Sequence, residues 1–153
     1  MIQLHDDFRD LLIALADAGA EFVVIGGYAV AFHGHVRATK DLDVLVRATV
    51  ANSERVFRAL AAFGAPLQAF EVESSDFATY DGVLQIGVPP YRVDIINRAA
   101  GISFDDATSE GATFEVEGRF IPVIGKRALL TNKRAAARAQ DIADVEALES
   151  LEP

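Results

Sequence analysis

The stretch IGGYAVAFHGHVRATKDLDVLV, residues 25–46, decides the fold because it places two glycines ahead of two aspartates in an otherwise apolar strand. Side chains of a strand alternate between its faces, so Asp41 and Asp43 share one face while Leu42 and Val44 share the other. Burying a carboxylate without a partner costs free energy. The charged face of this strand is therefore either wet or occupied by a cation, and the other face supplies the core.

Length and composition predict a single globular domain over residues 1–153, since the chain is 51% hydrophobic and 24% charged. No apolar run is long enough to span a bilayer, and the N-terminus lacks a signal-peptide pattern, so we expect no membrane partner. The absence of cysteine excludes disulfides and thiolate metal sites and favours a cytoplasmic protein. The net charge of −9 argues against a broad nucleic-acid-binding surface.

Hydrophobic periodicity predicts strands that alternate with helices. Asp6 or Asp7 is the expected cap of the first helix, and Gly64 is expected to end the third. This interleaving predicts the α/β or α+β class, with one sheet on which helices pack. Helices are expected over 8–19, 28–32, 56–63 and 127–151, the last broken near 131–134, and strands over 22–25, 41–46, 83–88, 91–97, 113–116 and 119–123, with Pro89-Pro90 joining two of them.

The later segment YRVDIIN repeats the anomaly, because Asp94 is a lone acid in an apolar strand. If this strand lies beside that of Asp41 and Asp43, three carboxylates converge. Such hard oxygen ligands suit Mg²⁺, and three of them are enough to hold two metal ions. Two plainer interpretations stay open: a D-x-D pair is often a solvated strand end, and Asp94 has Arg92 and Arg98 as possible ion-pair partners.

Gly26 and Gly27 lie between a strand and a short helix, which is the layout of an anion site. Neither the P-loop nor the dinucleotide-binding spacing of glycines is present. The pair is therefore either a phosphate cradle or a tight turn. A phosphate cradle gains support from the carboxylates that follow it, because they could carry the counter-metal.

A basic run from Lys126 to Arg138 is either a solvated helix face or a local binding patch, and Lys133 lies within it. Asp141 and Asp144 share a helix face three residues apart, so they either orient Lys133 or Arg138 or lie at the surface.

Histidines offer a possible zinc site at His33 and His35. Three histidines and no cysteine in the whole chain make a closed zinc site improbable. We expect His33 to be structural, hydrogen-bonding the loop that leads to Asp41.

The pattern G-G-x-A-x-x-x-H-G-x-x-R-x-T-x-D-x-D, from Gly26 to Asp43, together with Asp94, resembles the nucleotidyltransferase superfamily typified by DNA polymerase β. It is most similar to the AbiEii-like toxin nucleotidyltransferases and their small uncharacterised cousins. The tail LLTNKRAAARAQDIADVEALE is also similar to theirs, with Lys133, Arg138, Asp141 and Asp144 at the matching places.

This resemblance implies a nucleotidyltransferase fold, a mixed sheet flanked by helices. It implies Mg²⁺, or Mn²⁺, bound by Asp41, Asp43 and Asp94, and an NTP substrate whose phosphates lie over Gly26-Gly27. In the chemistry that the resemblance implies, an acceptor hydroxyl attacks the α-phosphate and displaces pyrophosphate, with Asp94 as the third ligand or the base.

The resemblance also favours a role for Lys133 in neutralising triphosphate charge. Arg37 and Thr39 are expected to line the approach to the metal, with Arg37 near phosphate. The implied acceptor is a tRNA end, a protein or a small molecule, and a toxin role would bring an antitoxin partner. Two alternatives stay open: a non-catalytic NTP-binding module, and a plain interaction domain whose acids are solvated.

Overall fold

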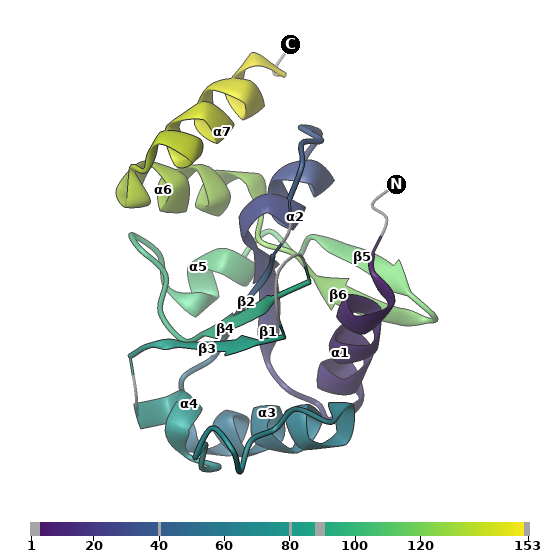
Figure 1. Ribbon diagram of the computed structural model, residues 1–153. Coiled ribbons are helices and arrows are strands. Elements are labelled where there is room, and N and C mark those ends of the chain that lie inside the picture. Colours follow the sequence, from purple (N-terminus) through teal and green to yellow (C-terminus); the bar gives the residue numbers. More distant parts are fainter. Residues whose placement is uncertain (1–3, 40, 80, 88–90, 152–153) are drawn as a thin grey trace.

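The computed structural model describes residues 4–39, 41–79, 81–87 and 91–151, in which helices surround a four-stranded sheet and a separate hairpin (Figure 1). The strands are β1 (Phe22–Ile25), β2 (Leu42–Val46), β3 (Val83–Ile86), β4 (Val93–Ile96), β5 (Thr113–Val116) and β6 (Arg119–Pro122). The helices are α1 (Asp6–Asp17), α2 (Gly26–Phe32), α3 (Val50–Phe63), α4 (Asp76–Thr79), α5 (Phe104–Thr108), α6 (Lys126–Ala136) and α7 (Ala139–Ser150).

The larger sheet is mixed, with strand order β1-β2-β4-β3. β2 runs parallel to β4, whereas β1 and β3 are antiparallel to their neighbours. In the parallel pair Asp43 lies opposite Asp94, and in the antiparallel pair Ile25 lies opposite Asp43. The acids therefore gather where β2 and β4 begin and β1 ends. The predicted adjacency of the two strands that carry them is confirmed.

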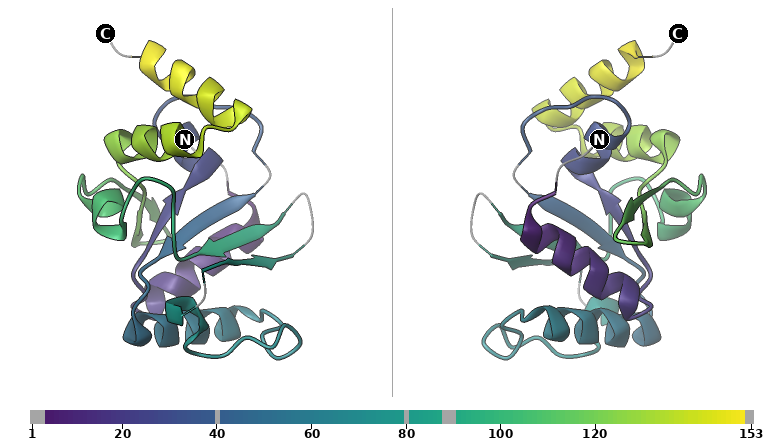
Figure 2. Two further views of the ribbon diagram at one scale, coloured as in Figure 1. Left: turned by 90° about the vertical axis from the view of Figure 1, so that its left-hand side faces the viewer. Right: turned by 90° about the vertical axis from the view of Figure 1, so that its right-hand side faces the viewer.

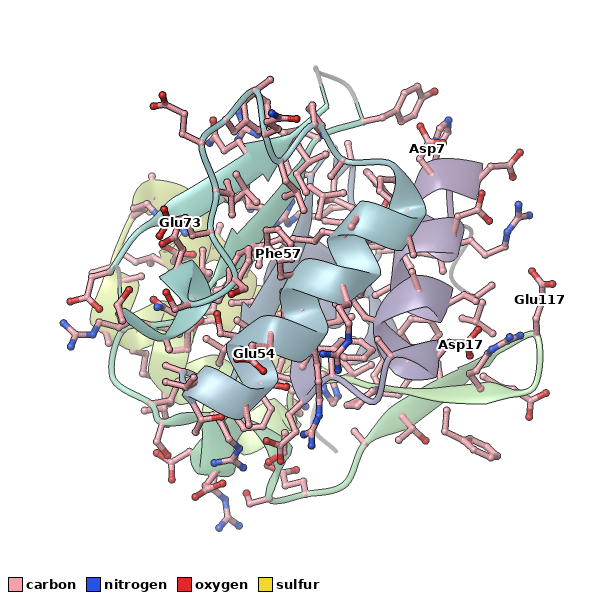
Figure 3. The ribbon with its side chains drawn as sticks, turned by 90° about the horizontal axis from the view of Figure 1, so that it is seen from below. Asp7, Asp17, Glu54, Phe57, Glu73 and Glu117 are labelled. Atoms are coloured by element: carbon pink, nitrogen blue, oxygen red, sulfur yellow. The ribbon has the colours of Figure 1, made fainter. Side chains whose placement is uncertain are left out.

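Both faces of β2 are buried beyond its aspartates. Leu42, Val44 and Val46 join a core with α1 and α3, which lie side by side over this face (Figure 3). Leu45 points to the opposite face and packs in a second core with residues of α2, α5 and α6. Figure 2 shows α6 and α7 at one end of the molecule and α3 at the other, with the sheet between them.

The predicted hairpin around Glu117 and Gly118 is confirmed as β5 and β6. Both turn residues have positive φ, 47° and 82°, as hairpin turns with matching strand twist require. The hairpin forms its own sheet and meets the larger one through a bridge between Val24 and Val123. The expectation of one sheet is therefore wrong, because only a single bridge, made by the residue after β6, joins the hairpin to β1.

The expected start of α1 is also wrong, because His5 caps it through its ring nitrogen rather than Asp6 or Asp7 through a carboxylate. α2 begins at Gly26, so the two glycines form its first turn. The end of α3 at Gly64, with φ of 98°, is confirmed.

The C-terminal helical region breaks later than the sequence predicts. The break lies at Ala137, which has φ of 56°, and not near 131–134, where the chain stays helical. Residues 88–90, which include the end of one predicted strand and Pro89-Pro90, fall outside the described part of the chain. Within the part described, no helix is long and apolar enough to cross a membrane.

Candidate active site

A cavity of about 620 Å³ opens at the edge of the sheet where the aspartates gather. Its walls come from α2, the loop after it, β2, β4 and the C-terminal helices. The predicted site residues all line it: Gly26, Gly27, Arg37, Thr39, Asp41, Asp43, Asp94 and Lys133. Five further polar residues share the wall: Arg98, Arg138 and Asp141, which the sequence analysis considered in other roles, and Asn132 and Gln140, which it did not consider.

A larger hollow of about 990 Å³ lies on the other side of the loop at residues 37–39. Its lining is mostly apolar, from Tyr28, Phe32, Val36 and Phe114 among others, and the carboxylates of β2 and β4 do not reach it. The predicted carboxylates and Lys133 therefore line the smaller cavity and not the larger hollow.

Asp43 is the most perturbed acid of the site. Burial raises the pKa of its carboxyl, and the neighbouring charges of Asp94 and Asp41 raise it further, to about 7. A hydrogen bond with the Asp94 carboxyl adds to the increase, whereas the positive charge of Lys133 opposes it. At neutral pH this acid is therefore partly protonated in the metal-free protein, because its negative charge is not fully compensated.

Arg92 joins the other two acids. Its Nη2 donates to Asp41 Oδ2 at 2.8 Å, and its Nε donates to Asp94 Oδ1 at 3.1 Å. Of the two partners expected for Asp94, Arg92 is therefore the one found, while Arg98 pairs with Asp81 at the surface.

The acids fit a divalent cation by chemistry, because all three offer hard carboxylate oxygens to one cavity. Asp43 and Asp94 share a hydrogen bond, but Asp41 is linked to Asp94 through the guanidinium of Arg92. Among the residues described, no three acidic or histidine side chains are yet gathered around one point as a metal centre would need. Ligation by Asp41, Asp43 and Asp94 stays a prediction.

The glycines are required by close packing against the acids. A Cβ on Gly26 would collide with the carboxylate of Asp43, and one on Gly27 would collide with the side chain of Thr39. Gly26 also has φ of 69°, which disfavours other residues. The pair thus lets β2 and the loop approach the first turn of α2, and phosphate binding there stays a prediction.

Lys133 is buried, which a solvated helix lysine would not be. Its Nζ lies 3.0 Å from Asp141 Oδ1 and 3.0 Å from Asp144 Oδ2, and all three side chains are at most 5% exposed. Of the alternatives left open for Asp141 and Asp144, contact with Lys133 is found and a position at the surface is not. Arg138 also contacts Asp141, through Nε at 2.7 Å, so both basic partners that were considered are held.

Asp144 also binds Arg37, which ties the loop before β2 to α7. Arg37 donates from Nε and Nη2 to the two carboxylate oxygens at 2.8 and 2.9 Å. Burial alone would raise the pKa of Asp144, but the hydrogen bonds from Arg37 and Lys133 outweigh it and lower the pKa to about 2. Arg37 therefore binds α7 through Asp144 and also lines the cavity.

His33 is structural, as expected, but its partner differs from the expectation. Its Nε2 donates to the carbonyl oxygen of Ile124 at 2.7 Å, which joins the end of α2 to the segment after β6. The bond does not reach the loop that leads to Asp41.

Comparison with known proteins identifies the chain. Residues 4–152 match the family described as nucleotidyl transferase of unknown function (DUF2204). The chain belongs to this family. It is thus a nucleotidyltransferase, as the resemblance of the glycine and aspartate pattern implied.

Solved structures share the fold of this nucleotidyltransferase at low sequence identity. The antibiotic-resistance factor ANT(2'')-Ia has a TM-score of 0.61 at 13% identity, covering 95% of this chain and 83% of its own. The lincosamide antibiotic adenylyltransferase LnuA, solved with lincomycin bound, has a TM-score of 0.60 at 18% identity, covering 97% and 98%. A candidate nucleotidyltransferase, TM1012 of Thermotoga maritima, has a TM-score of 0.56 at 15% identity, covering 94% and 88%. No curated protein gives a significant sequence match.

A substitution at Gly26 would suffer both a collision of the new Cβ with Asp43 and strain from the positive φ, and these two costs can be measured separately. Gly19 has nearly the same φ, 70°, but open space where a Cβ would lie. We expect Gly19→Ala to cost about 1 kcal/mol of unfolding free energy from strain alone, and Gly26→Ala to cost at least about 1 kcal/mol more. Urea denaturation of both variants measures the difference, and equal losses would show that the carboxylate of Asp43 moves aside freely.

The raised pKa of Asp43 has a consequence for stability in the absence of metal. Its pKa is about 7 in the folded protein against 3.8 ordinarily, so the folded state binds more protons between these values and loses stability as pH rises through them. Asp43→Asn removes this penalty. In EDTA we expect the variant to match wild type near pH 4 and to exceed it by about 2 kcal/mol at pH 8. Denaturation at both pH values tests this, and a variant less stable at pH 8 would contradict it.

The buried network around Lys133 predicts a large effect of Asp144→Asn. Neutralising Asp144 leaves Arg37 and Lys133 without their shared anion, which we expect to cost about 3 kcal/mol. Glu149→Gln is the matched control, because its ion pair with Arg134 is half exposed and is expected to cost under about 1 kcal/mol. Thermal denaturation compares them, and similar losses would mean that the network contributes no more than a surface pair.

Proposed function

We propose that this nucleotidyltransferase uses a divalent metal, Mg²⁺ or Mn²⁺, to transfer a nucleoside monophosphate from NTP to a hydroxyl group of a small molecule. The observation that supports this most is the single cavity in which Asp41, Asp43 and Asp94 face Gly26-Gly27 and Lys133. Carboxylates and a lysine on facing walls suit a substrate that carries phosphates and a metal ion.

The three aspartates hold the metal in this proposal. When bound, the metal supplies positive charge at the phosphates and lowers the pKa of the acceptor hydroxyl. Asp94 is the third ligand or the base that takes the hydroxyl proton. The acceptor oxygen then forms a bond to the α-phosphorus as the bond to pyrophosphate breaks.

Lys133 supplies the positioned cation on the opposite wall. Asp141 and Asp144 fix its ammonium from two sides, so little side-chain entropy remains to be lost when phosphate binds. Its charge already reaches the carboxylate cluster, where it lowers the pKa of Asp43 against the other influences. The exposed guanidinium of Arg138 lies at the same cavity and adds positive charge for the triphosphate.

A small-molecule acceptor has more support than a nucleic acid. The net charge of −9 disfavours a wide RNA-binding face. The fold relatives include a lincosamide adenylyltransferase that the alignment covers over 98% of its length, so a chain of this size and fold is sufficient for a small acceptor there. A tRNA end and a protein side chain are the competing acceptors. A toxin role, an antitoxin partner and a cytoplasmic location stay predictions from the sequence.

Label transfer tests the proposal. The protein is incubated with each α-labelled NTP and Mg²⁺, together with lincomycin and other hydroxylated small molecules, total tRNA, or cell lysate. We expect labelled small-molecule product that disappears in EDTA and falls at least about a thousandfold in Asp43→Ala and Asp94→Asn. Glu149→Gln serves as the control with full activity, because its side chain lies away from the cavity.

The other outcomes are equally distinct. Label on tRNA or protein would replace the acceptor class but keep the reaction. Tight NTP binding without transfer to any acceptor would favour the non-catalytic module. No metal-dependent NTP binding would exclude both.

A further inference from the structure

Arg92 brings a positive charge to the acidic end of the sheet, where it pairs with two carboxylates rather than with Asp94 alone. It precedes β4, and its forked guanidinium binds Asp41 and Asp94 at once. The side chain is 28% exposed and that of Asp94 is 16% exposed, so these contacts are partly shielded from water. Charge-assisted hydrogen bonds of this kind are stronger than those of exposed pairs.

This guanidinium pairs directly with two acids of the cluster, whereas Arg138 acts on Asp43 through its charge and is itself paired with Asp141. Lys133 acts on Asp43 from the other wall, but its ammonium is already held by Asp141 and Asp144. When the three cluster acids are ionised, Arg92 leaves them with two net negative charges. A divalent metal that enters the cavity without nucleotide competes with Arg92 for oxygens of Asp41 and Asp94.

A nucleotide changes that competition. Its triphosphate adds negative charge and oxygen ligands at the cavity, and Mg²⁺ is commonly held by one or two carboxylates together with substrate phosphates. These added charges offset the repulsion between the metal and the guanidinium. Metal affinity is therefore low before nucleotide binds and higher afterwards, and by linkage the metal strengthens nucleotide binding by the same factor.

We infer that Arg92 is a positioning residue that makes metal binding depend on nucleotide: it acts as the internal counter-cation of Asp41 and Asp94, so the metal is taken up together with NTP. The inference rests on the proposed metal-dependent transfer. It assigns Arg92 no contact with the reacting atoms, and the residue does not line the cavity itself.

Two physical explanations of an Arg92 effect give different results. If its charge matters, Arg92→Lys behaves much like wild type, because the ammonium keeps the charge. If only the fork geometry matters, Arg92→Lys behaves like the neutral Arg92→Gln. Arg119→Gln is the matched control, because it removes a forked guanidinium bound to Asp17, away from the cavity.

The experiment measures Mn²⁺ affinity by calorimetry or electron paramagnetic resonance, without nucleotide and with a non-hydrolysable NTP analogue. We expect Arg92→Gln to bind Mn²⁺ about tenfold more tightly than wild type without nucleotide, and the enhancement by the analogue to shrink by a similar factor. Arg92→Lys and Arg119→Gln should stay within about twofold of wild type. Thermal denaturation in EDTA confirms folding, and Arg92→Met, which keeps much of the stem, replaces Arg92→Gln if that variant does not fold.

If Arg92→Gln binds Mn²⁺ no more tightly than wild type, this inference is overturned while the proposed function stands. An Arg92→Lys protein that binds Mn²⁺ as tightly as Arg92→Gln would overturn it as well. If no variant binds Mn²⁺ with or without the analogue, the proposed metal-dependent function fails, and the inference fails with it.

Discussion

The parallel pairing of β2 with β4 is the constraint on which the site depends. It sets Asp43 opposite Asp94 near the start of two strands whose other side chains are mostly buried. Burial is the main cause of the raised pKa of Asp43, and repulsion from the neighbouring carboxylates of Asp94 and Asp41 raises it further. The protein tolerates the repulsion because the hydrophobic core on both faces of β2 holds the strands in register.

The surrounding elements offset this charge in two ways. Arg92 offsets the charge of Asp41 and Asp94 directly, through hydrogen bonds of 2.8 and 3.1 Å. From the other side, α6 and α7 present Lys133 within a buried network whose anions, Asp141 and Asp144, hold it in place. Arg37 extends that network to the loop before β2, so ion pairs connect this loop to α7.

Local sequence patterns were sufficient where short-range chemistry decides the structure. The alternation of Leu42, Asp43 and Val44 predicted both the strand and its two faces, and turn residues predicted the β5–β6 hairpin and the end of α3. They failed at Ala137, because a left-handed alanine at a helix break has no local signal. The separate hairpin sheet also escaped prediction, since pairing between β6 and β1 is a long-range matter.

By itself the sequence determined the kinds of group at the site: two glycines, three acids and a lysine, with a pattern that marks a nucleotidyltransferase. Only the tertiary structure decided their partners. Arg92 rather than Arg98 reaches Asp94, and Asp144 holds Arg37 across more than a hundred residues of sequence. Spacing along a chain limits which residues share a face, but ion pairs and packing depend on which elements meet, and that is settled by the burial of the whole core.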